Sequence, residues 1–408
     1  MEAANCHHGT KDFIVNMIGK NKKRIHFLSA SDRINYGDLL FPIIIEKLFD
    51  DCNTKIIKYG IVESNLSDFG ALPTLSYREF QRNIKKDGGN VIVGGGEVLF
   101  VDWGSLYAFI NFFYSKVLFR IDRFEAKFNL TRFFLSDGNV KVPFAPQKKE
   151  LRSSKEIKII YNAVGGTFKN SRLRNKWRDF KKSLIDADYI SVRDKRVSNS
   201  LKEYGIESVI TPDSALIISD LFPFEELLGK ISFNPDQLKD YIFLQIGKPY
   251  TPPNKTEFFQ QLKNLSEKLE MEIILCPIGL APRHEDDIYL TELSQKSEIF
   301  TFIMPKNIYD IMFLIANSKI YLGTSLHGLI TAQSFGVPFI PMDKRVIKVE
   351  EYCKTWTFKN INRCINYSEL NEIPEIFRNW DSDIAYENLV AQKELVYKNF
   401  KNIEQHLI

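Results

Sequence analysis

Short apolar runs alternate with amphipathic stretches along most of the 408-residue chain. The short runs are typical of buried strands, and the stretches between them repeat apolar residues at helical spacing. This alternation, with mostly apolar strands, predicts parallel sheets covered by helices on both faces. The predicted strands are 25–30, 54–59, 91–93, 157–163, 189–192, 209–211, 241–247, 272–276, 300–303 and 320–323, and the predicted helices are 38–49, 177–185, 198–204, 255–268, 287–295, 308–316 and 328–335.

The alternation breaks at the segments LFPFEE (221–226) and FNPD (233–236), where prolines interrupt it. A chain of this length suits two domains, each with its own core. We therefore predict two Rossmann-like domains, residues 1–220 and 235–383. The helical stretch 384–408 is expected to pack back across both.

Residues 98–150 do not fit this pattern, because they are rich in aromatic and basic residues and too long for an ordinary loop. One interpretation is a helical insertion packed on the first domain. The other is a lid or a membrane-touching surface, since aromatic and basic side chains together suit the lipid interface.

The formal net charge of +4 is small and does not indicate an electrostatic nucleic-acid binder. The charge is uneven, however: residues 101–200 hold 21 Lys and Arg against 10 Asp and Glu. Such a surplus favours anionic ligands or an anionic membrane surface, although a solvated basic face would look the same.

The five cysteines lack metal-ligand or disulfide spacing, which points to a reducing compartment. The N-terminus, with His7, His8 and Lys11, lacks the apolar segment of a signal peptide. No apolar run reaches the roughly 18 residues of a membrane-spanning helix. We expect a cytoplasmic protein, either free or resting on the inner face of a membrane. The cysteines are Cys6, Cys52, Cys276, Cys353 and Cys364.

Ligands of such folds bind beyond the carboxyl ends of the strands, so the residues there are candidates for chemistry. Asn35 and Asp38 follow the first strand, and Gly95, Gly96 and Glu97 follow the third. Glycine amides can form an anion-binding nest, and a carboxylate after them would face the cleft. Plain turns and helix caps are the alternative.

Later strand ends carry Arg193, Asp213 and Lys248. His284 stands beside three acidic residues, but one histidine in a row of acids lacks metal-ligand spacing. A helix start is the better interpretation, and we predict no metal.

His327 lies where a buried strand, 319–323, gives way to a predicted helix. The amides of a helix N-terminus attract phosphates and carboxylates. A histidine there can contact the same anion and move protons near neutral pH. A structural histidine is the alternative.

Several motifs occur in a characteristic order: INYGD (34–38), VIVGGGE (91–97), SVRDKRVSNSLKEYG (191–205), TPDSAL (211–216), TSLHGLITAQSFGVPFIPM (324–342) and DKRV (343–346). Together they resemble the polysaccharide pyruvyl transferase family, from about residue 25 to 355. The resemblance implies a GT-B-like fold, with two Rossmann-like domains around a cleft. It also implies transfer of the enolpyruvyl group of phosphoenolpyruvate to a sugar, as a cyclic ketal. The sugar would belong to a cell-surface polysaccharide or its lipid-linked precursor.

The same resemblance implies that Arg193 and His327 contact phosphoenolpyruvate, with Ser325 and Leu326 beside them. Family members typically carry an arginine where this chain has Ser325. Another cation is then expected to replace it, from a loop at the same edge of the cleft. The candidates are Lys248, Arg283, Lys344 and Arg345.

Ketal formation needs a general acid and a general base near the donor. His327 is the expected acid, and Glu97 and Asp213 remain alternatives for the base. The scheme calls for no metal and no cofactor. The acceptor is expected near Asn35, Asp38, Gly95, Gly96 and Glu97.

Two other functions remain open, since a fold does not fix a function. One is a GT-B nucleotide-sugar glycosyltransferase, although the late glutamate that often holds the donor ribose is absent near Gln333. The other is a non-catalytic glycan-binding relative.

Overall fold

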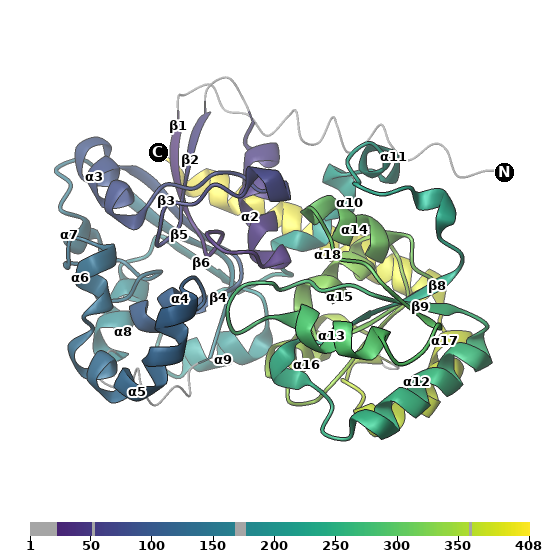
Figure 1. Cartoon of the computed structure of the whole chain (residues 1–408). Helices are drawn as coiled ribbons and strands as arrows, with labels where there is room; N and C mark the ends of the chain where they lie inside the picture. The colour runs from purple at the N-terminus through teal and green to yellow at the C-terminus, as the bar shows by residue number, and fades with distance from the viewer. Residues whose placement is uncertain (1–22, 51–53, 168–176, 359–360) are drawn as a thin grey trace.

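Two parallel β-sheets form the framework of the chain (Figure 1). A computed structural model describes residues 23–50, 54–167, 177–358 and 361–408. The strands are β1 (Lys23–Leu28), β2 (Thr54–Tyr59), β3 (Gly89–Gly94), β4 (Glu97–Leu99), β5 (Ile157–Gly166), β6 (Tyr189–Val192), β7 (Val209–Ile210), β8 (Tyr241–Gln245), β9 (Glu272–Leu275), β10 (Phe300–Phe302), β11 (Ile320–Gly323) and β12 (Phe339–Pro341).

The strand order is β2-β1-β3-β5-β6-β7 in the first sheet, where β4 also pairs with β5, and β10-β9-β8-β11-β12 in the second. The pairs within both sheets are parallel, which confirms the predicted fold class. Strands in such sheets are covered on both faces, and all five residues of β8 (YIFLQ) are accordingly buried.

Helices cover both sheets and connect their strands (Figure 1). Their bounds match the predicted ranges to within a few residues, although the helix expected from Gly328 begins at Leu326. Around the first sheet lie α2 (Tyr36–Leu48), α3 (Tyr77–Asp87), α8 (Trp177–Ile185) and α9 (Lys195–Lys202), and around the second α12 (Lys255–Leu269), α13 (Asp286–Ser294), α14 (Ile308–Ala316), α15 (Leu326–Ser334), α16 (Ile347–Trp356) and α17 (Ile373–Arg378). The 3-10 helix η3 (Ser214–Ile217) and helices α10 (Ile218–Leu221) and α11 (Phe224–Leu228) link the part of the chain that holds the first sheet, the first half, to the part that holds the second sheet, the second half.

Residues 98–150 form the helical insertion that the sequence suggested. Its helices lie beside the first sheet, and the first of them, α4, faces the second half (Figure 1). The insertion holds α4 (Trp103–Ala108), α5 (Phe112–Phe128), α6 (Thr131–Leu135) and α7 (Lys148–Leu151).

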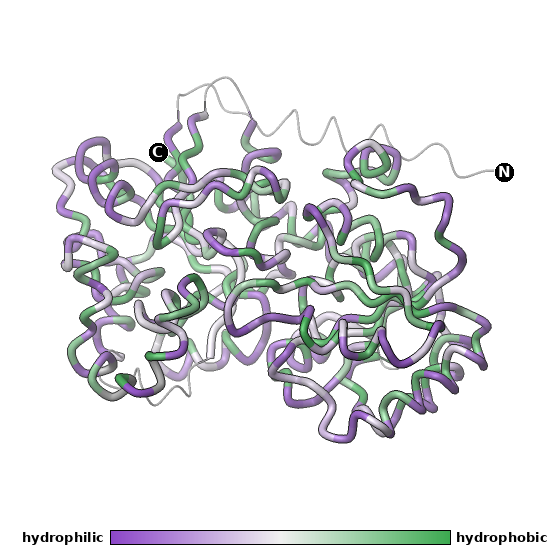
Figure 2. Tube along the Cα trace, in the orientation of Figure 1, coloured by the Kyte–Doolittle hydropathy of each residue, from purple (hydrophilic) through white to green (hydrophobic). Residues whose placement is uncertain are grey.

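One hydrophobic cluster is shared by both halves, and two others line their outer faces. The shared cluster joins Phe27 of β1, Ile44 of α2 and Leu329 of α15. Figure 2 shows apolar residues concentrated on the central strands, whereas surface helices such as α12 alternate apolar and polar positions. The shared core fixes the first turns of α2 and α15 against each other.

The C-terminal helix α18 (Ser382–His406) packs back onto the first sheet. The Asn399 amide donates to Asn162 of β5 at 2.8 Å and accepts from the Tyr189 hydroxyl of β6 at 2.8 Å. Phe400 beside it is fully buried in the shared core. The end of the chain therefore ties the second half to the first.

Cys276, Cys353 and Cys364 are buried free thiols. Cys6 and Cys52, and the N-terminal His7, His8 and Lys11, lie outside the described residues. In the described ranges, no helix combines the length and apolar character that crossing a bilayer requires.

We expect Phe400→Ala to lower the free energy of unfolding by about 3–5 kcal/mol, because a buried aromatic leaves a cavity in the shared core. Urea unfolding measures this. Phe113→Ala, at an exposed position of α5, is the control and should change stability by less than about 0.5 kcal/mol. Equal losses in the two variants would contradict a core role for α18.

Candidate functional site

A cavity of about 770 Å³ opens between the two halves, at the carboxyl ends of the strands. Its size suits a small-molecule site, and its position is the one expected for this fold class. Residues of both halves line it, among them Asn35, Asp38, Glu97 and Arg193 from the first and Gln245, Thr324, Ser325, His327, Arg345 and Lys348 from the second.

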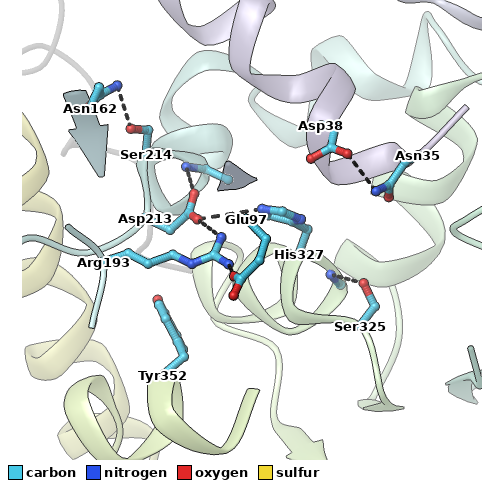
Figure 3. A network of polar contacts seen from close by, with 12 residues as sticks. Asn35, Asp38, Glu97, Asn162, Arg193, Asp213, Ser214, Ser325, His327 and Tyr352 are labelled. Atoms are coloured by element: carbon cyan, nitrogen blue, oxygen red, sulfur yellow. Dashed lines mark hydrogen bonds and ion pairs between the residues drawn. The ribbon is translucent and has the colours of Figure 1, made fainter. Parts of the chain in front are cut away.

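Arg193 lies between two carboxylates at one wall of this cavity (Figure 3). Its Nη2 donates to Glu97 Oε2 at 2.6 Å, and its Nη1 donates to Asp213 Oδ2 at 3.0 Å. Only 1% of the Arg193 side chain is exposed. A Cβ on Gly165 would meet the guanidinium at 2.7 Å, so the glycine leaves room for it.

The two carboxylates of this cluster differ in their access to solvent. Asp213 is fully buried, whereas 30% of the Glu97 side chain is exposed. Burial by itself would raise the pKa of each carboxyl. The charges of Arg193 and Lys348 outweigh it at Glu97, and His327 and Arg193 outweigh it at Asp213, so both pKa values lie below their usual range. Both groups are therefore ionised at neutral pH.

His327 occupies the first turn of α15 and faces the same cluster (Figure 3). Its Nε2 lies 3.6 Å from Asp213 Oδ2 and has no hydrogen-bond partner among the described residues. The ring packs edge-on against Phe41 of α2, with centroids 5.3 Å apart. A Cβ on Gly37 would overlap the imidazole, so the glycine of INYGD allows His327 its position.

Ser325, which stands where the family resemblance leads us to expect an arginine, is the N-cap of α15. Its Oγ accepts a hydrogen bond from the Gly328 amide at 3.3 Å. Leu326 follows it, but its side chain is buried in the shared core. Ser325 thus adds a hydroxyl, but no positive charge, to the cavity.

Of the cations expected to replace that arginine, Arg283 and Arg345 line the cavity. Lys248 pairs with Glu285, and Lys344 pairs with Glu369 at 3.4 Å; neither lines the cavity. The structure therefore does not bring these two lysines to the cavity, because acidic neighbours hold both on the surface. Arg345 itself pairs with Asp343 at 2.6 Å.

Lys348, in the first turn of α16, is a cation that the sequence analysis missed. It is partly buried and lines the cavity. Burial and the charge of Arg193 lower its pKa, which Glu97 and Asp38 partly offset. The sequence could have indicated Lys348, because α16 follows β12, the strand after β11. The first turn of α16 therefore also lies at the carboxyl edge of the sheet.

The predicted acceptor residues separate into two groups. Asn35 and Asp38 line the cavity, and the Asn35 amide donates to the Asp38 carboxylate at 2.8 Å. Gly95 and Gly96 do not line it. The Gly95 amide donates to the Asn162 carbonyl, so it is not free to form an anion nest. Gly95 instead allows Phe41 to pack closely, since a Cβ there would overlap that ring.

A second group of cations surrounds Phe109 of the insertion, at another part of the cavity wall. The guanidinium carbons of Arg33 and Arg283 lie 5.9 and 5.6 Å from the Phe109 ring centroid. His284 packs against the same ring at 5.2 Å, and burial lowers its pKa to about 3. His284 is therefore neutral at pH 7. Arg33 also pairs with Asp32 at 2.9 Å. An aromatic ring with guanidinium groups beside it suits a sugar that carries phosphate.

Asp286 of α13 also lines the cavity and is buried. Burial raises its pKa to about 7, although hydrogen bonds from the Gly279 amide at 2.9 Å and the Gln245 amide at 2.8 Å act in the opposite direction. These bonds tie β8 to the loop before α13. No group of three or more His, Cys, Asp or Glu side chains in the described chain is arranged to hold a metal ion.

The sequence matches a family model, Polysaccharide pyruvyl transferase, over residues 35–343. None of the curated proteins compared with it matches. Similar solved structures include a UDP-N-acetylglucosamine 2-epimerase (TM-score 0.53, 14% identity, 95% of this chain and 96% of that one). Another is a UDP-GlcNAc 2-epimerase from Methanocaldococcus jannaschii (TM-score 0.50, 14% identity, 92% of this chain and 99% of that one). A third is S. aureus MnaA in a co-structure with UDP (TM-score 0.50, 12% identity, 91% of each chain). These likenesses confirm the GT-B-like fold.

We expect Arg193→Ala to lower the free energy of unfolding at pH 7 by about 3–5 kcal/mol, because it removes the nearest charge partner of two carboxylates, Glu97 at the cavity wall and the fully buried Asp213. Arg193 lowers the pKa values of both carboxyls, so its stabilising effect is present above their unfolded pKa values, about 4, and is lost as pH falls. The difference from wild type should therefore shrink on acidification. Urea unfolding across pH 4–7 measures it.

Arg363 provides a matched control, because it also pairs with two carboxylates, Glu369 and Glu372, both at 3.1 Å, but on the surface. Arg363→Ala should cost no more than about 1 kcal/mol. A similar cost for both variants would contradict the buried cluster as a source of stability.

Proposed function

The chain belongs to the polysaccharide pyruvyl transferase family, and we propose that it transfers the enolpyruvyl group of phosphoenolpyruvate to a sugar as a ketal. The acceptor is a cell-surface polysaccharide or its lipid-linked precursor. One observation carries the proposal. The family's separate motifs converge on one cavity, where the His327 imidazole and Arg193 share the carboxylate of Asp213.

The site that binds the donor needs positive charge, since phosphoenolpyruvate carries about three negative charges at neutral pH. Arg193 is largely neutralised by Glu97 and Asp213. We therefore assign the donor phosphate to the first turn of α15 and to Lys348, with Arg193 and Arg345 at its edges. A helix N-terminus and a partly buried lysine provide the amides and the charge that phosphate binding requires.

In the proposed reaction, His327 acts as general acid and protonates the methylene carbon of the donor. The oxygen of one sugar hydroxyl then attacks the neighbouring carbon and loses its proton. Attack by the second hydroxyl expels phosphate and closes the ring. The two hydroxyl protons are thus accounted for: one replaces the proton that His327 gives to the new methyl group, and the other leaves with phosphate.

Glu97 is a better candidate for the base than Asp213, because Glu97 lines the cavity and Asp213 does not. Its lowered pKa makes it a weak base, so its main role is to accept a hydrogen bond from the attacking hydroxyl and orient it. Asp213 is fully buried behind His327, and we assign it the role of orienting the imidazole. Asn35, Asp38 and the group around Phe109 are assigned to the acceptor.

A nucleotide-sugar donor is the main alternative. Gln333, near which such enzymes would carry a glutamate, is buried and hydrogen-bonded to Tyr352 and Gln392, and it does not line the cavity. Thermal shift with phosphoenolpyruvate and with UDP-sugars separates the functions. Stabilisation by a UDP-sugar alone would overturn the proposal, and no response to either would favour a non-catalytic glycan-binding protein.

The direct test incubates candidate glycans with the protein and phosphoenolpyruvate and measures product mass. A gain of one pyruvyl unit, with release of phosphate, is expected. Phosphate release without a change in glycan mass would mean hydrolysis instead of transfer.

We expect His327→Ala to reduce turnover about 100- to 10,000-fold, the usual contribution of a general acid. Because the ring lies at the cavity wall, circular dichroism and the melting temperature should stay near those of wild type. Full activity in this variant, or loss of folding, would favour a structural histidine.

We expect Lys348→Ala to weaken donor binding about 10- to 100-fold, the value of one charge-assisted contact. Calorimetric titration with phosphoenolpyruvate measures it. Lys344→Ala, four residues earlier on the surface, is the matched control and should leave the donor Kd unchanged. The reverse outcome would restore Lys344 as the replacing cation.

A further inference from the structure

The outer face of α5 carries a stripe of exposed apolar side chains. Phe113 is 80% exposed, and Val117, Phe124 and Phe128 are each about half exposed. Their spacing of four, seven and four residues places all four on one face of the helix. Soluble proteins rarely leave such a contiguous face without a partner.

Two further phenylalanines, Phe133 and Phe134, are exposed on the next helix, α6, the latter to 77%. From their exposed fractions, Phe113, Phe124, Phe133 and Phe134 together present on the order of 500 Å² of apolar surface, at roughly 200 Å² for a whole aromatic side chain. Contact of this apolar surface with water does not stabilise the protein.

A basic row runs beside the apolar stripe on α5. It consists of Lys116, Arg120 and Lys127, spaced four and seven residues apart and all exposed. The ammonium groups of Lys116 and Lys127 lie 4.1 and 5.1 Å from the ring centroids of Phe112 and Phe128. Cations and aromatic rings thus form one mixed face.

The acidic side chain described on α5, Glu125, is buried and points away from this face. It accepts hydrogen bonds from the Leu130 amide at 3.1 Å and the Thr131 amide at 3.2 Å. Of the charges on described side chains of α5, the exposed ones are therefore positive, and a partner with negative charge is favoured.

We propose that the α5 face, defined by Phe113, Lys116, Val117, Phe124 and Lys127, docks on an anionic lipid surface. Aromatic rings favour the boundary between headgroups and acyl chains, and lysines beside them pair with lipid phosphates. This mixed composition fits an anionic bilayer better than a second copy of the chain, because two such faces would bring like charges together.

The α5 face lies close to the cavity along the chain. Phe109 lines the cavity and α5 begins three residues later, at Phe112, a distance of at most about 10 Å along the backbone. Figure 1 shows α4 between α5 and the junction of the two halves. A docked protein would present the wall around Phe109 to sugars held at the membrane. This consequence rests on the proposed function, whereas lipid binding itself does not.

The experiment is co-sedimentation of the full-length protein with vesicles, one set of phosphatidylcholine alone and one of equal parts phosphatidylcholine and phosphatidylglycerol. We expect binding to the anionic vesicles that weakens with salt. Phe113→Glu with Phe124→Glu should reduce it more than tenfold. Lys116→Ala with Lys127→Ala should reduce it about fivefold per lysine and abolish the anionic preference.

The matched control is Ile384→Glu with Tyr386→Glu, at exposed apolar positions of α18. This variant should bind like wild type. Absence of wild-type binding to anionic vesicles, or equal loss in the control, would overturn the proposal. A change of oligomeric state in Phe113→Glu with Phe124→Glu, with vesicle binding intact, would instead identify the face as a contact between copies.

Neither α5 variant alters a residue assigned to the reaction, so transfer to a water-soluble acceptor should continue at the wild-type rate. Loss of vesicle binding with that activity retained supports the lipid contact. Vesicle binding by a wild-type protein that transfers nothing would disprove the proposed function alone.

Discussion

The guanidinium of Arg193, held between Glu97 and Asp213, is the interaction on which the site depends. It joins three segments that are far apart in sequence: β4, the end of β6 and the loop before η3. A buried cation of this kind is tolerated only when its charge is matched. Trp356 of α16 adds a hydrogen bond to the Arg193 carbonyl at 2.7 Å, which connects the second half to the same residue.

This pairing also limits what Arg193 can do for an anionic ligand. Two ionised carboxylates together carry one more charge than Arg193, and Arg196, 3.8 Å from Glu97, offsets part of that excess. Beside Arg193, the positive charge at the cavity therefore comes mainly from the second half, where Lys348 and Arg345 line the cavity. The first half, in turn, places Asp213 3.6 Å from the imidazole of His327 and Glu97 at the cavity wall. Each half thus contributes different charged groups to the cavity.

The shared core holds the cavity residues of the two halves in fixed positions relative to one another. The Tyr36 hydroxyl of α2 lies 2.9 Å from the Thr331 hydroxyl of α15, and Gly37 contacts the His327 ring. INYGD and the SLHG turn are thus one packed unit, although nearly 300 residues separate them. A glycine in one motif is required by the size of a side chain in the other.

The sequence by itself determined the elements and their order, because hydrophobic periodicity and turn residues act within one or two turns of the chain. The range 177–185 of α8, the strand before His327 and the parallel arrangement all follow from that local pattern. The motifs at the strand ends also located the cavity, since parallel strands bring their carboxyl ends to one edge. Only the tertiary structure decided which charges meet there. Glu97 and Arg193 are 96 residues apart, and Lys344 and Lys348 differ by one turn, yet one lysine pairs with Glu369 on the surface and the other lines the cavity. The partner of a long charged side chain is set by the elements packed around it, and these come from distant parts of the sequence.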